Sequence, residues 1–169
     1  MTRLGNDEEI SLGKGGAAPN SIVRQEAKAF YVMGPPASGK SGVSSQIADL
    51  YGCYILDSDY AKRKLPEYKN QIAAAALVHE ESDAIVFGEN GLMDHCMALR
   101  NNIVIPKIGW NIVSVLKMCN GLNDAGYKVY LISVDLDRQK ATQRAYNRFI
   151  TTSRYVPLSL VFDNYGNQS

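Results

Sequence analysis

The chain has 169 residues, of which 46% are apolar and 21% are charged, values that fit one soluble globular domain with a sizeable core. A net charge of +1 provides no global field that would recruit nucleic acid or a membrane surface. The apolar run over residues 73–78 is too short to cross a bilayer, and the acidic start of the chain lacks the layout of a signal peptide. The three cysteines show neither zinc-site spacing nor an even number, so we expect a reduced, cytoplasmic protein.

Residues 1–26 are polar and rich in glycine, which predicts a flexible or loosely packed extension ahead of a single domain over residues 27–169. From residue 29 the pattern alternates between strands and helices. Strands are predicted over 29–34, 53–58, 102–106 and 128–134, and helices over 40–51, 60–65, about 70–100, 110–125 and 137–152.

This alternation predicts an α/β fold of the P-loop NTPase type, in which a doubly wound, mainly parallel sheet carries helices on both faces. Ligands of such folds bind at the carboxyl ends of the strands. We find no fifth strand in the last residues of the chain, as expected of a truncated or C-terminally shortened version of the fold.

The first predicted strand leads into a complete phosphate-binding motif, G-x-x-x-x-G-K-[ST], and Gly42, the next residue, is also predicted to bind the nucleotide. The motif consists of Gly34, Pro35, Pro36, Ala37, Ser38, Gly39, Lys40 and Ser41. Between a strand and a helix, the backbone N–H groups of such a loop surround a phosphate at the positive end of the helix dipole. Lys40 would reach β- and γ-phosphate oxygens, and the Ser41 hydroxyl would ligate Mg²⁺. The chain is therefore predicted to bind ATP or GTP together with Mg²⁺.

Two aspartates, Asp57 and Asp59, close the second predicted strand at the sheet edge where the phosphate loop opens. Their spacing puts both side chains on one side of the strand, if the strand continues that far. One acid would hold Mg²⁺ and the other would deprotonate an acceptor hydroxyl in phosphoryl transfer. The alternative is an Asx turn that leads into the helix at Tyr60.

Three arginines follow the fourth predicted strand: Arg144, Arg148 and Arg154. Arg144 and Arg148 share a helix face because they are four residues apart. Guanidinium groups make two-point contacts with phosphate oxygens and stabilise charge on a phosphoryl group during transfer. The alternative is a solvated basic face.

Together these elements resemble the zeta-toxin family of small P-loop kinases over residues 30–157. Besides the phosphate loop, the resemblance is carried by Leu56-Asp57-Ser58-Asp59, Leu65-Pro66-Glu67-Tyr68, Val78-His79-Glu80-Glu81-Ser82, Ala141-x-x-Arg144-x-x-x-Arg148 and Ser153-Arg154-Tyr155-Val156-Pro157. It implies a kinase that uses ATP and Mg²⁺ to phosphorylate UDP-N-acetylglucosamine, with an antitoxin protein as a partner.

The resemblance also implies roles for single residues. Asp59 would be the base that accepts the proton of the sugar hydroxyl, which leaves Mg²⁺ to Asp57, and Lys40 would clamp the phosphates. Arg144 and Arg154 would be lid arginines that close over the triphosphate, with Arg148 as a further nucleotide contact. His79 is expected to line the acceptor pocket rather than to bind a metal.

One segment departs from the family pattern. After the third strand the family usually carries an acid followed by Gly-Thr-x-Arg-like residues that hold the sugar acceptor, and here the sequence is Ile105-Pro106-Lys107-Ile108-Gly109-Trp110. The apolar side chains cannot replace those hydrogen bonds. The acceptor is therefore open between a sugar nucleotide, a similar polar metabolite and an antibiotic hydroxyl of the chloramphenicol phosphotransferase type. A non-catalytic ATP-binding module is the alternative of another class, but it needs no base such as Asp59.

Overall fold

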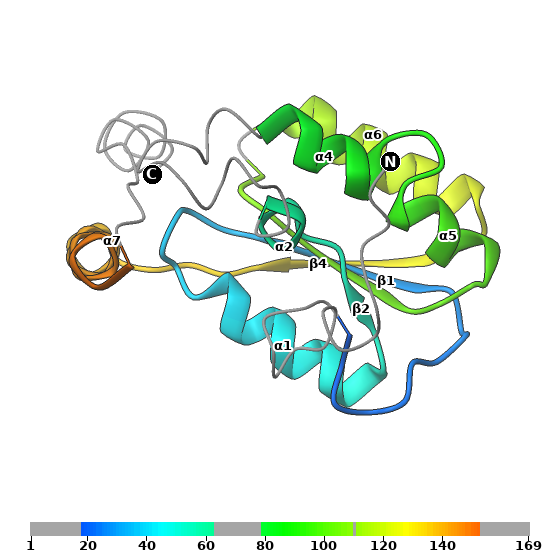
Figure 1. Cartoon of the computed structure of the whole chain (residues 1–169), viewed down its shortest axis with the longest axis horizontal. Helices are drawn as coiled ribbons and strands as arrows, with labels where there is room; N and C mark the ends of the chain where they lie inside the picture. Colours follow the sequence, from blue (N-terminus) through cyan, green and yellow to red (C-terminus); the bar gives the residue numbers. More distant parts are fainter. Residues whose placement is uncertain (1–17, 63–78, 110, 153–169) are drawn as a thin grey trace.

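In the computed structural model of the protein, residues 18–62, 79–109 and 111–152 are described. Their centre is a parallel sheet in the order β2-β3-β1-β4 (Figure 1). Its strands are β1 (Lys28–Met33), β2 (Tyr54–Ile55), β3 (Ile103–Lys107) and β4 (Lys128–Ser133). The chain moves from β1 to one side of the sheet and later returns to the other side with β4. The carboxyl ends of β1 and β3 therefore flank the point where the winding reverses, which is where ligands bind in folds of this kind.

Alternate residues of the central strands enter two separate cores, because both faces of the sheet are covered. On β1, Ala29 and Tyr31 pack with Ile103 of β3 on one face, whereas Phe30 and Val32 pack on the other. The first face is covered by α4 (His79–Phe87), α5 (Leu92–Ala98) and α6 (Ile112–Asp124), and the second by α1 (Lys40–Tyr51), as Figure 1 shows. This two-sided burial confirms the predicted arrangement of helices on both faces.

Two further helices lie at the carboxyl edge of the sheet. The short helix α2 (Ser58–Lys62) follows β2, and α7 (Arg138–Thr152) follows β4 (Figure 1). The helix α7 begins where the side chain of Asp137 accepts hydrogen bonds from the backbone N–H groups of Gln139 and Lys140, at 3.0 and 3.2 Å. Such a side-chain cap satisfies backbone donors that have no partner inside the helix.

The predicted helix over about 70–100 is wrong in its described part. Residues 79–98 form two helices, α4 and α5, separated at residues 88–91. Gly88 closes α4, since its N–H bonds to the carbonyl of Ala84 at 2.9 Å, and Asn90 then takes the left-handed conformation with a φ of 59°. A left-handed residue cannot continue a right-handed helix, so the chain turns before α5 begins.

The second strand is also shorter than predicted. It spans only Tyr54–Ile55, although the N–H of Leu56 still bonds to the carbonyl of Val104 at 2.9 Å. Pro106 has no N–H to donate to the sheet, and it lies on β3 beyond the end of this short ladder, paired with Val32 of β1.

The N-terminal segment that precedes β1 is described from residue 18. The backbone N–H of Asn20 bonds to the carboxylate of Asp49 at 2.8 Å, and that of Arg24 bonds to the carbonyl of Gly52 at 2.9 Å. These contacts tie the segment to the end of α1. In the parts of the chain that the structure describes, no helix combines the length and apolar character needed to cross a membrane.

Candidate active site

The phosphate-binding motif forms a tight loop between β1 and α1. The N–H of Ser38 bonds to the carbonyl of Pro35 at 3.2 Å, and Ala37 and Gly39 both have positive φ angles, of 62° and 102°. Gly34 is required by close approach, because a Cβ there would lie 2.4 Å from the carbonyl oxygen of Val134. The strand, loop and helix predicted for residues 29–51 are thus present, with α1 starting at Lys40.

The surroundings of two polar side chains of the loop, Lys40 and Ser38, indicate a site for a ligand with several oxygen atoms. The ammonium group of Lys40 donates to the carbonyls of Gly34 and Pro35, at 2.8 and 2.7 Å, which holds it against the loop. The Ser38 side chain is buried, and its hydroxyl has no hydrogen-bond partner among the described residues. Buried hydroxyls are normally bonded, so an unpaired one beside a phosphate loop fits a site that takes a phosphate.

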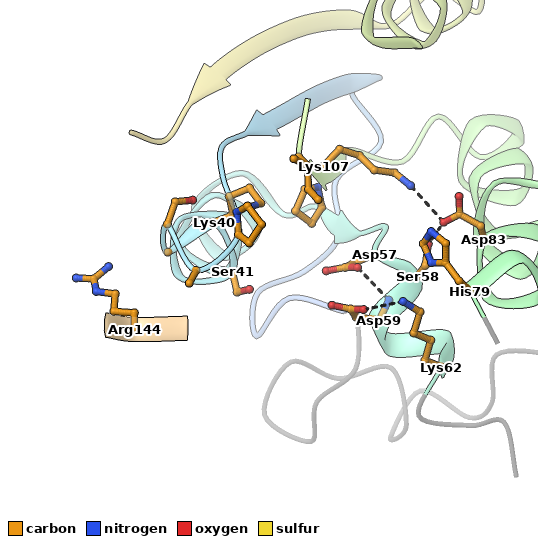
Figure 2. A pocket seen from close by; sticks show the side chains of 16 residues that line it. Lys40, Ser41, Asp57, Ser58, Asp59, Lys62, His79, Asp83, Lys107 and Arg144 are labelled. Carbon is orange, nitrogen blue, oxygen red and sulfur yellow. Dashed lines mark hydrogen bonds and ion pairs between the residues drawn. The ribbon is translucent and has the colours of Figure 1, made fainter. Parts of the chain in front are cut away.

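A cavity of about 520 Å³ opens in front of the loop. The loop and the start of α1 form one wall, and α2, the start of α4 and the end of β3 form the opposite wall (Figure 2). The lining includes six residues of the predicted motif, from Pro36 to Ser41, together with Asp57, Ser58, Asp59, Lys62, His79, Asp83, Pro106, Lys107, Ile108 and Arg144.

Asp57 and Asp59 lie on the wall opposite Lys40 and Ser41 (Figure 2), but the backbone that carries them differs from the predicted strand. They do not extend from a strand, since β2 ends at Ile55 and α2 begins at Ser58. Instead the carboxylate of Asp57 accepts the N–H of Asp59 at 3.0 Å, which is an Asx turn. The turn and the placement in the cavity therefore occur together, although the sequence presented them as alternatives.

The proposed metal ligands Ser41 and Asp57 both border the cavity, from opposite walls. Within the described ranges there is no cluster of three or more His, Cys, Asp or Glu side chains that could hold a metal ion. Mg²⁺ in phosphoryl-transfer sites is usually held by one or two carboxylates together with substrate phosphates and water. The donor set of Ser41 and Asp57 fits that mode of binding.

Of the three predicted arginines, Arg144 reaches the site. It lies on α7 and lines the cavity, and its Nη1 atom is 3.8 Å from the position that a Cβ on Gly39 would occupy. The guanidinium therefore lies beside the phosphate loop. Arg148 belongs to the same helix, but its side chain, like the whole of Arg154, lies outside the described residues.

The structure adds residues to the site that the sequence did not indicate. Lys62 forms an ion pair with Asp59, with 3.3 Å between its Nζ atom and the carboxylate. Lys107, at the end of β3, forms an ion pair of the same length with Asp83 of α4. His79, which was expected at the acceptor pocket, does line the cavity. The only signal for Lys107 was its place directly after a buried strand, in the segment that departs from the family pattern.

Asp83, a carboxylate that lines the cavity, has a shifted pKa. Burial disfavours its charged form, but the hydrogen bond from Ser58 and the positive charge of Lys107 outweigh burial and lower its pKa below the usual value. Asp83 is therefore ionised at neutral pH and keeps its ion pair with Lys107.

Taken together, the sheet order, the phosphate loop at the reversal point and the carboxylates that face it define an α/β protein with the fold of P-loop kinases. The sequence profile of the zeta-toxin family matches residues 17–167, and the chain belongs to this family. No curated protein sequence gives a significant match.

Solved structures that share the fold include the following two. One, from the PezAT chromosomal toxin–antitoxin system of Streptococcus pneumoniae, has a TM-score of 0.66 and 15% identity, and covers 86% of this chain. The other, a candidate kinase from Chloroflexus aurantiacus, has a TM-score of 0.66 and 14% identity, with 84% of this chain and 80% of its own length covered. The chain spans 63% of the length of the pneumococcal protein, so the likeness concerns that part of it.

Proposed function

We propose that this protein is an ATP·Mg²⁺-dependent small-molecule kinase that phosphorylates a hydroxyl group. One observation carries the proposal: the phosphate loop and Asp59 line opposite walls of one cavity of about 520 Å³. A nucleoside triphosphate held by the loop would place its γ-phosphate toward the wall that carries the carboxylates. A nucleotide-binding module without catalytic activity needs no such carboxylate.

The chain's residues would divide the work of the transfer. Lys40 and the loop N–H groups would bind the β- and γ-phosphates, and Arg144 would stabilise the charge that develops on the transferred group. Asp59 would accept the proton of the acceptor hydroxyl as its oxygen forms a bond to the γ-phosphorus. The bond from that phosphorus to the bridging oxygen breaks, and ADP leaves. Bound Mg²⁺, held by Ser41 and Asp57, would supply neutralising charge for the phosphates.

The acceptor is proposed to be a sugar nucleotide or a similar polar metabolite. Membership in the zeta-toxin family supports the sugar nucleotide. The wall beside Asp59 is polar and carries Lys62, His79 and Lys107, which suits an acceptor with several hydrogen-bonding groups. Pro106 and Ile108 on the same wall offer no side-chain hydrogen bonds, so the contacts to the acceptor would differ from the usual family pattern. An antitoxin partner is proposed because the pneumococcal relative comes from a toxin–antitoxin system.

The test is to follow ADP formation by the purified protein with ATP and Mg²⁺ against a panel of acceptors. The panel holds UDP-N-acetylglucosamine, other sugar nucleotides and antibiotic alcohols, with water alone as the blank. We expect ADP in proportion to a phosphorylated acceptor identified by mass spectrometry. Binding of ATP without phosphorylation of any acceptor would contradict the kinase and support the non-catalytic module.

The phosphate loop is tested in the same assay. Lys40→Ala should abolish turnover, because the loop would lose the ammonium group proposed to contact the β- and γ-phosphates. Lys117→Ala on α6 is the matched control, since Lys117 is an exposed lysine outside the cavity lining. Turnover near the wild-type rate in folded Lys40→Ala protein would remove residues 34–41 from the site.

A further inference from the structure

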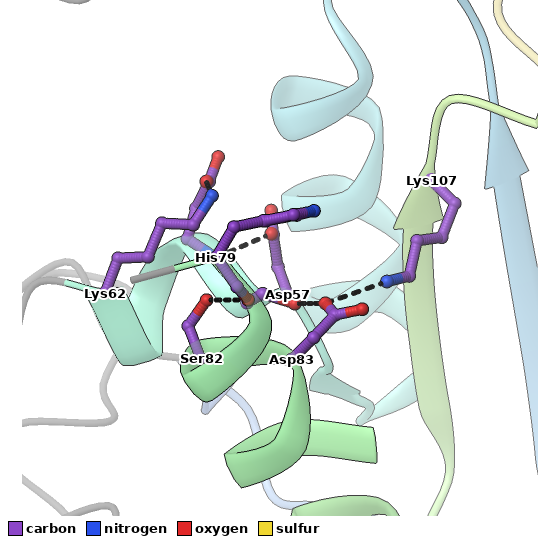
Figure 3. A network of polar contacts seen from close by, with 8 residues as sticks. Asp57, Lys62, His79, Ser82, Asp83 and Lys107 are labelled. Carbon is purple, nitrogen blue, oxygen red and sulfur yellow. Dashed lines mark hydrogen bonds and ion pairs between the residues drawn. The ribbon is translucent and has the colours of Figure 1, made fainter. Parts of the chain in front are cut away.

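Three separate elements are joined at the acceptor wall of the cavity by one carboxylate. The hydroxyl of Ser58, the first residue of α2, donates a hydrogen bond to Oδ1 of Asp83 on α4. The ammonium group of Lys107, at the end of β3, lies 3.3 Å from the same oxygen (Figure 3). It also lies 4.0 Å from the centre of the Phe87 ring. Asp83 therefore ties the start of α2 to the end of a central strand.

The contacts of Asp83 with Ser58 and Lys107, called the tie below, hold helix α2, which needs support from other elements. The helix α2 has five residues, far fewer than a helix requires to be stable by its own hydrogen bonds. The strand before it has only two residues, so the sheet holds it weakly as well. The helix α2 packs against α4, so α4 helps to set its orientation, in addition to the turn made by Asp57 and the burial of Ala61. Asp59 is the second residue of this helix, one position after Ser58.

The exposure of the ion pair between Asp83 and Lys107 argues against a large contribution of this pair to global stability. The side chains of Asp83 and Lys107 are 40% and 30% accessible, and ion pairs as exposed as this one add little to the free energy of folding. A small error in the position of a catalytic group, in contrast, lowers a reaction rate strongly. The effect of the tie is thus expected in the geometry of the site.

We propose that Asp83 is a positioning residue for Asp59, which it orients toward the acceptor hydroxyl by fixing Ser58 against Lys107. This inference rests on the proposed kinase function. Lys107 neutralises the Asp83 carboxylate and holds it in place, and His79 of α4 borders the same cavity. Asp83 itself exchanges no proton with the acceptor.

The experiment compares Asp83→Ala and Asp83→Asn with the wild type in the full chain. Asp83→Asn keeps the shape and an oxygen for Ser58 but loses the ion pair, so it should lose less activity than Asp83→Ala. We expect kcat for acceptor phosphorylation to fall about tenfold or more in Asp83→Ala, with the KM for ATP and the midpoint of urea unfolding close to wild type. Hydrogen exchange of the peptide 56–62 should become faster. Glu89→Gln, an exposed carboxylate just after α4 and outside the cavity lining, is the control.

A double-mutant cycle separates positioning from independent effects. If Asp83 acts through Asp59, Asp83→Ala should cause little further loss of kcat in an Asp59→Asn background. Full additivity of the two losses, or wild-type kcat in both Asp83 variants, would overturn the inference while leaving the kinase in place. A wild-type protein that phosphorylates no acceptor would overturn the proposed function and the role of Asp83 with it.

Discussion

Asp57 and Asp59 differ in what their carboxylates already contact. Asp57 closes a turn by accepting a backbone N–H, whereas Asp59 forms an ion pair with Lys62, and its side chain is 30% accessible. A residue that must meet a substrate hydroxyl has to be reachable from the cavity, and Asp59 meets this condition from the first turn of α2.

This difference gives separate predictions for the two acids. Asp59→Asn should lower kcat by ~10²–10⁴-fold with little change in ATP affinity, the range typical of a lost general base. Asp57→Asn keeps an oxygen for the turn but removes the charge, so it should raise the Mg²⁺ concentration needed for half-maximal rate. Steady-state kinetics at several Mg²⁺ concentrations distinguish the two effects. If Asp57→Asn gives the larger loss at saturating Mg²⁺ and Asp59→Asn almost none, the roles are exchanged.

Arg144 permits a similar separation of binding from transfer. Arg144→Ala should lower kcat more than it raises the KM for ATP, because its contact would strengthen as charge develops on the transferred phosphoryl group. Arg144→Lys should restore little, since an ammonium cannot make the two-point contact of a guanidinium. Gln143→Ala, its exposed neighbour on α7, serves as the control. A raised KM with unchanged kcat would show instead that Arg144 only binds the nucleotide. Arg154 stays a predicted second lid residue, to be tested by the same substitutions.

Residues of the site could be predicted where all the residues that act together are neighbours in the sequence. The phosphate loop needs eight neighbouring residues between a strand and a helix, and all of these are visible in the sequence. Lys107 and Asp83 were not predictable as a pair, because they lie 24 residues apart and their contact depends on how α4 packs beside β3.

At the scale of elements, two glycines that end helices allow a matched comparison of backbone strain with steric clash. Gly52 after α1 and Gly126 after α6 both have positive φ angles, of 62° and 79°. A Cβ at Gly126 would meet nothing closer than 3.6 Å, whereas one at Gly52 would lie 2.3 Å from the carbonyl oxygen of Ile22.

Gly126→Ala should therefore cost only the left-handed backbone strain, about 1–2 kcal/mol in the free energy of unfolding. Gly52→Ala should cost more, because the segment around Ile22 must also move away from α1. Urea unfolding followed by circular dichroism measures both. Equal losses of unfolding free energy in the two variants would show that the segment around Ile22 can move away from α1 without cost, which would contradict its hydrogen bonds with the end of α1.

Helix α1 was predicted at its observed bounds, residues 40–51, directly after the phosphate-binding motif. The argument that Asp57 and Asp59 share the side of a strand was wrong, because periodicity cannot reveal that β2 pairs over only two residues. The predicted helix over about 70–100 is interrupted at Asn90, which adopts the left-handed conformation. The spacing of apolar residues carries no information about this backbone conformation.

At the scale of the whole molecule, the three cysteines report on the integrity of the two cores. Cys53 and Cys96 are fully buried, and burial raises the pKa of each thiol to about 12. Cys119 is buried too, and burial raises its pKa in the same direction. Because the thiolate is the reactive form, we expect none of the three to react with a disulfide reagent at pH 8 in the folded protein, and all three to react in urea. Rapid labelling of one thiol in the native protein would show that its core opens locally.

The same shifts, together with the raised pKa of the buried Tyr127 phenol, contribute to the loss of stability at alkaline pH. A thiol whose pKa is higher in the folded state favours folding fully below the pKa of the unfolded thiol, and this contribution disappears as the pH rises toward the folded value. The free energy of unfolding should thus decline from about pH 9 upward. Urea titrations at pH 7.5 and pH 10 measure the difference. The variants Cys53→Ala and Cys96→Ala should each make the difference in unfolding free energy between pH 7.5 and pH 10 smaller.

The architecture as a whole followed from the alternation of strands and helices, since parallel strands buried on both faces leave few other arrangements. The order of the strands and the identity of the acceptor did not follow. Strand order depends on which hydrophobic faces meet. The choice of the proposed acceptor would depend on the side chains of Lys107, His79 and Lys62, which lie on three different elements and meet only in the folded chain.

The close approach of Gly34 to Val134 has a consequence for how the protein acquires its site. The two residues are roughly 100 positions apart, so the phosphate loop cannot close against its neighbour until β4 has docked beside β1, which is a slow kind of contact to form. On the ribosome, a nascent chain that has emerged only as far as α6 already carries the whole motif and still has no finished nucleotide site. A nucleotide that binds only the completed sheet would stabilise the docked position of β4, the last strand of the described residues.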